Sequence, residues 1–248
     1  MLFRSLGKMS ALFVVSTPIG NLEDITYRAV RILGEVDLIA AEDTRHTRKL
    51  LAAYDIHTPT TSLHSHNESG KAASLLRRIE DGEDIALVSD GGTPGISDPG
   101  GRLIRAAIDL DIRVIPAPGP SACIAAASVA GLPTASFYYA GFCSPKSGRR
   151  RRRMESLRDL EVTLVFYESP HRVKRFLSDA EEVFGARPAV AARELTKVYE
   201  EFVRGSLTDL RAHFEETAPR GEFTILIHGR GDDEPSITAD DSGGATGA

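Results

Sequence analysis

Cysteine and long hydrophobic runs are scarce in this chain of 248 residues. The two cysteines, Cys123 and Cys143, have no CxxC spacing, which argues against a disulfide framework or a cysteine zinc site and is typical of a reducing cytosol. No apolar run approaches the roughly 20 residues of a membrane-spanning helix. The first ten residues lack the apolar core of a signal peptide. We therefore expect a cytoplasmic protein that does not bind membranes.

Several signatures of common active sites are also missing. No GxGxxG follows the first predicted strand, which weakens a dinucleotide-binding interpretation. The spacing of Gly95 and Gly100 matches a phosphate-binding loop, but Gly101 stands where that loop needs lysine. No GxSxG is present. His64 and His66 are better explained as surface residues than as metal ligands, so we expect no metal.

The chain carries little excess charge overall. Its formal net charge of -5 gives no general attraction to nucleic acid. Locally, however, five arginines follow one another, and on a helix such a run places cations on all sides, which is unfavourable without a polyanion nearby. We therefore favour contact with RNA or DNA over simple solvation for Arg149, Arg150, Arg151, Arg152 and Arg153.

Apolar runs alternate with amphipathic segments in the first half of the chain. This alternation predicts right-handed crossovers and a mostly parallel sheet. Asp24 is expected to cap the first helix, and Ser65 with Glu68 has the spacing of a capping box for the third. The predicted strands are 12–16, 37–41, 60–63, 85–89 and 113–115, and the predicted helices are 24–33, 45–53, 68–81 and 102–110.

Three prolines within 116–120 interrupt this pattern, and we interpret the segment as a connector between domains. Beyond it, helices become fewer, which suggests a second α/β domain with a mixed sheet. Ser121 is expected to cap a helix over 122–130, and Ser169 to cap another. The remaining predicted strands are 137–142, 162–167, 189–193, 200–204 and 223–228, and the remaining helices are 148–160, 171–184 and 207–215. We expect an N-terminal extension at 1–10, domains at 11–117 and 118–230, and a disordered acidic tail at 231–248.

Three polar loops follow predicted strands of the first sheet. The most informative, 90–101, holds five glycines and two prolines, and glycine lets a backbone approach a ligand closely. The others are 16–24 and 42–45. Because the carboxyl ends of parallel strands share one edge of a sheet, we expect these loops to converge and form a ligand site.

Together with two later segments, these loops resemble the ribosomal RNA small subunit methyltransferase I family, of the tetrapyrrole-methylase-like class. The resemblance extends over about residues 11–229 and rests on the segments 14–25, 41–45, 89–100, 118–122 and 166–172. It implies two α/β domains of the tetrapyrrole-methylase type, with S-adenosylmethionine (SAM) in the cleft between them, and a homodimer. It also implies methylation of a cytidine ribose 2′-hydroxyl in the decoding region of 16S rRNA, within the small ribosomal subunit.

The resemblance implies roles for individual residues. Methyl transfer from a sulfonium is an in-line displacement that requires alignment and no metal. A ribose hydroxyl needs an acceptor to orient it, and the candidates are Asp43, Glu42 and Glu168. Arg45, Arg172 and Arg193 join the arginine run as candidates for holding RNA phosphates. The expected SAM contacts are Ile19, Thr93, Ile96, Ser97, Ser121, Ala122, Tyr167, Leu195, Glu222 and Phe223.

Two other functions stay open at this point. A corrin or porphyrin-precursor methylase would use the same fold, although Thr93 stands where those enzymes usually carry aspartate. A non-catalytic RNA-binding protein would have the same arginines without binding the cofactor.

Overall fold

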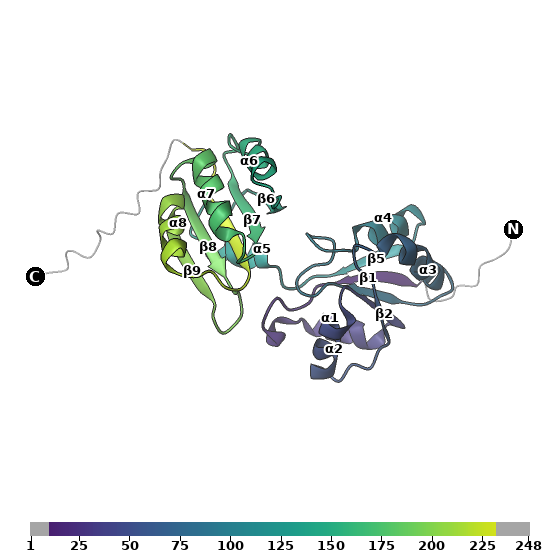
Figure 1. Cartoon of the computed structure of the whole chain (residues 1–248). Coiled ribbons are helices and arrows are strands. Elements are labelled where there is room, and N and C mark those ends of the chain that lie inside the picture. Colours follow the sequence, from purple (N-terminus) through teal and green to yellow (C-terminus); the bar gives the residue numbers. More distant parts are fainter. Residues whose placement is uncertain (1–9, 232–248) are drawn as a thin grey trace, which may run out of the picture.

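The computed structural model describes residues 10–231 and shows two lobes (Figure 1). They are joined by the segment between β5 (Arg113–Ala117) and α5 (Ala122–Val129). Each lobe contains one five-stranded sheet, so the prediction of two α/β domains is confirmed. We propose 11–117 and 118–230 as their limits, because β5 ends the first sheet while α5 packs on the second. The predicted extension and tail lie outside the described residues, except for positions 10 and 231.

The first lobe is built from β1 (Ala11–Val15), a short 3-10 helix (Leu22–Asp24), α1 (Tyr27–Glu35), β2 (Leu38–Ala41), α2 (Thr44–Ala53), β3 (Thr60–Ser62), α3 (Glu68–Glu80), β4 (Ile85–Val88), α4 (Gly101–Asp109) and β5. Its strands are all parallel, in the order β3-β2-β4-β1-β5. The helices α1 and α2 cover one face through residues such as Ile32 and Leu51. The other face is covered by α3 and α4, through Leu75 and Leu103. Burial on both faces explains the continuous apolar sequences of β2 and β4.

The second lobe is built from α5, β6 (Phe137–Phe142), α6 (Ser147–Glu155), β7 (Thr163–Glu168), α7 (Val173–Phe184), β8 (Pro188–Arg193), β9 (Glu201–Ser206), α8 (Leu207–Glu216) and β10 (Phe223–Ile227). The strand order is β6-β7-β10-β8-β9, and only β6 and β7 pair in parallel. This mixed sheet agrees with the sequence prediction. On one face it packs against α7 and α8, and on the other against α5.

Three predicted helix caps are wrong. The first helix begins at Tyr27 rather than Asp24, because the hydroxyl of Thr26 accepts the N–H of Ala29 and caps it there. The side chain of Glu68 does not close a capping box with Ser65. Its Oε1 accepts the N–H groups of Arg102 and Leu103 instead, so it caps α4 from a neighbouring helix. The helix α7 begins at Val173, after a turn in which the carbonyl of Ser169 accepts the N–H groups of Arg172 and Val173.

Two further differences concern prolines and helix length. The strand β5 continues through Pro116 to Ala117, whereas the predicted strand ends at Ile115. Proline is tolerated there because β5 is an edge strand and needs no second row of hydrogen bonds. The helix α6 ends at Glu155, well before the predicted end at residue 160. Ser121 precedes α5 as its N-cap residue, but its side chain makes no capping hydrogen bond.

Candidate functional site

The three polar loops of the first lobe meet at the carboxyl edge of its sheet, as predicted. Thr17 and Gly92 exchange two backbone hydrogen bonds of 2.9 Å each, which joins the loops after β1 and β4. The hydroxyls of Ser16 and Thr93 lie 2.9 Å apart and strengthen the same junction. The backbone N–H of Asp43 donates to Oδ1 of Asp90 over 3.0 Å, which joins the loop after β2 to the loop after β4.

These loops and the second lobe together enclose a cavity of about 970 Å³. Such a volume is at the upper end of the range for small-molecule and cofactor sites. Its wall includes all ten residues expected to contact SAM, namely Ile19, Thr93, Ile96, Ser97, Ser121, Ala122, Tyr167, Leu195, Glu222 and Phe223. Their contact with a cofactor stays a prediction.

Glycine is required at two positions around this cavity. Gly92 has a φ of +87°, a backbone conformation that side chains disfavour, and a Cβ there would lie 3.6 Å from Cγ2 of Ile19. At Gly20, a Cβ would lie 2.4 Å from Cγ of Lys197 in the other lobe. The loop after β1 therefore passes against the second lobe at a distance that only glycine allows.

Hydrogen bonds between the lobes hold the two walls of the cavity together. The backbone N–H of Asn21 donates to the hydroxyl of Thr196 over 3.1 Å. The hydroxyls of Ser97 and Tyr139 lie 2.6 Å apart. Ser97 has a φ of +64°, so its backbone is held in a conformation that is uncommon for a residue with a side chain.

Carboxylates give part of the cavity wall a negative charge. Glu42, Asp90 and Asp98 all line it. Burial, with the nearby charges of Glu42 and Asp90, raises the pKa of Asp98 to about 6. Burial and the charge of Asp90 also raise the pKa of Glu42. A cationic ligand would relieve this mutual repulsion, so the wall favours a positive charge.

Glu168 is the third predicted carboxylate; it is among the residues that line the cavity, and its side chain is fully buried. Oε1 of Glu168 pairs with Nη2 of Arg172 at 2.6 Å and accepts the N–H of Ser169 at 2.8 Å. Its other oxygen, Oε2, is buried and has no hydrogen-bond partner among residues 10–231. A buried acceptor without a donor is unfavourable, so Oε2 is suited to receive a donor from a ligand.

Asp43, in contrast, does not line the cavity. Its carboxylate accepts hydrogen bonds from Nε and Nη2 of Arg45, and it caps α2 through the N–H of Arg45. These bonds lower the pKa of Asp43 well below its usual range. Asp43 is therefore a poor proton acceptor, and Glu42 and Glu168 are the better candidates for that role. Arg45 itself remains exposed beside the cavity.

The five-arginine run is less cationic than its sequence implies. Arg150 is buried, with 2% of its side chain exposed, and it pairs with Asp179 through Nη2 at 2.5 Å and Nε at 2.7 Å. The prediction that it contacts RNA is wrong, since a partner cannot reach it. Arg151 pairs with both Asp179 and Glu182. Within the described part of the chain, Arg149 and Arg152 are exposed and without an acidic partner, and Arg153 lies over the ring of Tyr138.

The two remaining arginine candidates have partners within the molecule. Arg172 is bound to Glu168, and Nε of Arg193 lies 2.9 Å from a carboxylate oxygen of Glu201. Neither lines the cavity. Between residues 10 and 231, no group of three or more His, Cys, Asp or Glu side chains is placed to hold a metal ion. None of the helices in that range has the length and apolarity to cross a membrane.

Several residues of the cavity wall were not predicted from the sequence. Asp98 stands in the glycine-rich loop, so its position there was the signal that could have identified it. Phe142 ends β6 and packs edge-on against Tyr167, with 5.6 Å between the ring centres. His46 and Lys49 lie on α2 and line the cavity. Nothing in the spacing of Phe142, His46 or Lys49 distinguishes them from ordinary surface residues.

Comparisons with known proteins agree with this geometry. Residues 11–211 match the family model of tetrapyrrole (corrin/porphyrin) methylases. A protein of Synechocystis sp. named ribosomal RNA small subunit methyltransferase I is 49% identical over 232 residues, which cover 93% of this chain and 83% of the relative. The protein of that name from Bacillus subtilis is 41% identical, over 94% of this chain and 80% of the relative.

Solved structures show the same fold at low sequence identity. A diphthine synthase superposes with a TM-score of 0.70 at 13% identity, over 88% of this chain and 89% of that one. A uroporphyrin-III-C-methyltransferase from Thermus thermophilus superposes with a TM-score of 0.61 at 20% identity, over 88% of this chain and 94% of that one. These solved structures establish the architecture, and the relatives at 41–49% identity identify the family within it. The chain belongs to the tetrapyrrole methylases and, among them, to the ribosomal RNA small subunit methyltransferase I family.

Proposed function

We propose that this protein transfers a methyl group from SAM to the ribose 2′-hydroxyl of a cytidine in the decoding region of 16S rRNA. The relatives at 41–49% identity carry the name of a small-subunit rRNA methyltransferase, which supports an rRNA substrate. The observation that carries the proposal is the cavity between the lobes, where glycine loops and carboxylates form one wall. The cytidine, the 2′-hydroxyl and the decoding region come from the family resemblance alone.

The residues of the cavity fit SAM in charge, and its volume is that of a cofactor site. When bound, SAM supplies a methyl group activated by a positively charged sulfur. The carboxylates of Asp98, Glu42 and Asp90 provide a negative environment for that charge. At Gly92 no side chain obstructs the cavity, and the buried Oε2 of Glu168 has no donor among the described residues. Among ligands of this size, a cation with several hydrogen-bond donors suits this wall best.

Glu42 is our candidate for orienting the acceptor hydroxyl. It lies at the carboxyl end of β2 and lines the cavity, and its raised pKa makes it a better proton acceptor than an exposed glutamate. Glu168 is the second candidate, although its salt bridge to Arg172 favours a binding role. The most important contribution of the protein is to hold the two reactants in line, because proximity and orientation alone provide a large part of such a rate enhancement.

The RNA is expected to contact exposed cations of both lobes. Arg45, Arg149, Arg152 and Arg153 have side chains at the surface of the described structure. Phosphate contacts of this kind position a substrate without reading its sequence. The homodimer and the cytoplasmic location also stay predictions from the resemblance and from the composition.

A methylase acting on a corrin or porphyrin precursor is the second candidate function, because solved enzymes of that kind share the fold. Their identity to this chain is 20% or less, far below that of the rRNA methyltransferase relatives. The comparison therefore favours RNA over a corrin or porphyrin precursor as the substrate.

The decisive experiment combines the protein with isotopically labelled SAM and with small ribosomal subunits taken from cells that lack this protein. We expect label in the 16S rRNA, and mass spectrometry of nuclease fragments should place it on the ribose of one cytidine. Label on a base, or on a macrocyclic tetrapyrrole added in competition, would contradict the proposal. Isothermal titration with SAM distinguishes the non-catalytic alternative, since that protein would show no heat of binding at millimolar ligand.

A further inference from the structure

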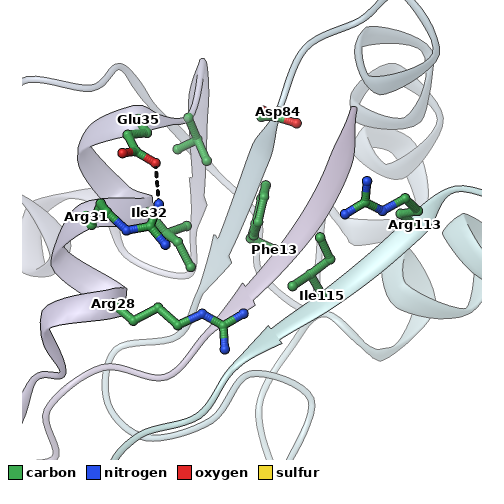
Figure 2. A pocket seen from close by; sticks show the side chains of 9 residues that line it. Phe13, Arg28, Arg31, Ile32, Glu35, Asp84, Arg113 and Ile115 are labelled. Atoms are coloured by element: carbon green, nitrogen blue, oxygen red, sulfur yellow. Dashed lines mark hydrogen bonds and ion pairs between the residues drawn. The ribbon is translucent and has the colours of Figure 1, made fainter. Parts of the chain in front are cut away.

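A second hollow lies on the first lobe, on the face of the sheet that α1 covers (Figure 2). We call it the α1 groove, and its volume is about 380 Å³. Its floor is apolar, with Phe13 and Ile115 from neighbouring strands and Ile32 from α1. Three guanidinium groups surround this floor, and they belong to Arg28, Arg31 and Arg113.

The connectivity of the fold explains why this floor is uncovered. A parallel sheet usually has helices over both faces. Here, within residues 10–231, α1 and α2 cover the central strands, and the edge strand β5 has its main helix contact, α4, on the opposite face, although Ala117 at its end packs on the α1 side. After β5 the chain crosses to the second lobe, where α5 packs on the other sheet. Phe13 and Ile115 consequently stay only half-buried.

The charge of the α1 groove is positive. Within residues 10–231, no carboxylate pairs with Arg28 or Arg113. Arg31 is bound to Glu35 at 2.7 Å. The remaining acid, Asp84, is buried and accepts the N–H of Ala11 at 3.0 Å. The groove therefore presents two unpaired arginines and a third that is exposed beside its partner.

An exposed aromatic residue adds to this surface. Tyr27 is 97% exposed and lies four positions before Arg31, so both project from the same side of α1. Aromatic rings and arginines together form the surfaces on which unpaired bases stack while phosphates are held. Arg28 extends toward the carboxyl ends of β1 and β5, the edge of the sheet where the cavity between the lobes lies (Figure 2).

We propose that the α1 groove binds an unpaired stretch of the RNA substrate, with phosphates on Arg28, Arg31 and Arg113 and a base against the apolar floor. This inference rests on the proposed function, since it extends the binding of the same RNA. A second copy of the chain is disfavoured, because a two-fold contact centred here would bring arginines of both copies together.

The test uses a double variant, in which Arg28→Gln and Arg113→Gln are combined, and compares it with a matched control. The control, Arg77→Gln with Arg105→Gln, removes the same charge from α3 and α4 on the opposite face of the sheet. Filter binding with single-stranded RNA oligonucleotides should show Kd raised about 10-fold for the groove variant. The slope of log K against log salt should fall by about 1.4, since each single-strand phosphate contact contributes about 0.7. SAM affinity by calorimetry should not change.

The outcomes separate this inference from the proposed function. If the groove variant and the control bind RNA equally, the inference is overturned even when the wild type methylates rRNA. A variant that binds RNA normally but sediments with a different mass would assign the groove to a contact between copies, which also overturns it. If the wild type binds RNA through the groove but transfers no methyl group, the proposed function fails and the groove assignment stands. Tyr27→Ala should weaken binding by a further factor of about 5 without affecting folding.

Discussion

Two basic regions of the molecule differ in how their sequence relates to their surface. In α6, five consecutive arginines form the most cationic segment of the chain, yet Arg150 is buried and Arg151 is held by two carboxylates. In the α1 groove, Arg28, Arg31 and Arg113 come from two separate elements and converge around one hollow. A run of like charges in a sequence is therefore a poor measure of the charge that a partner meets.

The cavity between the lobes differs from both basic regions, because part of its wall is acidic. Its wall carries Glu42, Asp90 and Asp98, while the surfaces proposed for RNA carry arginines. A cationic cofactor and a polyanionic substrate would be attracted to different places on the same protein. The comparison predicts that changes in one region should leave the ligand of the other region unaffected.

The largest effect is expected at Arg150, the buried member of the arginine run. Arg150→Gln removes one partner of a buried ion pair and leaves Asp179 without its main counter-charge. Such changes lower the free energy of unfolding by about 3–5 kcal/mol. Urea denaturation followed by circular dichroism measures this loss.

Arg149→Gln is the matched control, since it alters the neighbouring position at the surface. It should change the free energy of unfolding by no more than about 0.5 kcal/mol. Equal stability of the two variants would show that Arg150 is not the structural residue of this run. The comparison between a buried and an exposed arginine would then have to be abandoned.

The second effect is expected at Gly92, in the cavity. Gly92→Val forces a branched side chain into a backbone with a φ of +87° and places it in the cavity beside Ile19. SAM affinity should fall by roughly 100-fold or more, while RNA affinity is retained. Calorimetry with SAM and filter binding with RNA measure the two quantities separately.

Gly82→Val is the control for backbone strain. Gly82 also has a positive φ, of +108°, but a Cβ there meets nothing within 4 Å. Both variants should lose about 1–2 kcal/mol of stability from the unfavourable conformation. Only Gly92→Val should lose SAM. Normal SAM binding by this variant would remove the glycine loop from the cofactor site.

The convergence of the loops could be predicted because it follows from topology. Parallel strands carry the loops 16–24, 42–45 and 90–101 to one edge, whatever the details of their side chains. The pairing of Arg150 could not be predicted in this way, because its partner Asp179 lies on a different helix and is identified only by the packing of α6 on α7. The same holds for Glu68, whose carboxylate caps a helix that is distant in sequence.

The α1 groove illustrates a third kind of limit. The apolar pattern of Phe13 and Ile115 predicts strands, and both residues do lie in strands. Whether a helix covers them depends on where the chain goes after β5. The prolines at 116–120 predict a connector, but they carry no information about the face that the departing chain leaves uncovered.

The third effect concerns the exposed arginines of α6. Changing Arg149, Arg152 and Arg153 together to glutamine, with Arg150 and Arg151 left intact, should weaken RNA binding by about 10-fold and leave SAM affinity unchanged. Each of these side chains is exposed, so folding should be preserved. Filter binding over a salt series measures the effect. A loss of SAM affinity as large as the loss of RNA affinity would contradict the separation of the two regions.

The smallest effect is expected at Asp98, where the negative charge of the cavity depends on pH. Its pKa of about 6 lies above the value of 3.8 that applies to an unperturbed aspartate, so the folded state holds a proton that the unfolded state releases. Stability contributed by this group is therefore present below pH 4 and lost as the pH rises through 6. Asp98→Asn should raise the melting temperature at pH 8 and have little effect on it at pH 4.

At pH 8 the Asp98→Asn variant should also bind SAM more weakly by roughly 3- to 10-fold, because a partly solvated charge pair contributes about 1 kcal/mol. In the wild type, SAM affinity should fall as the pH drops below 6, and in the variant this part of the pH dependence should disappear. If both proteins showed the same pH profile, Asp98 would not be the carboxylate that faces the sulfonium, and Glu42 would be the next to test.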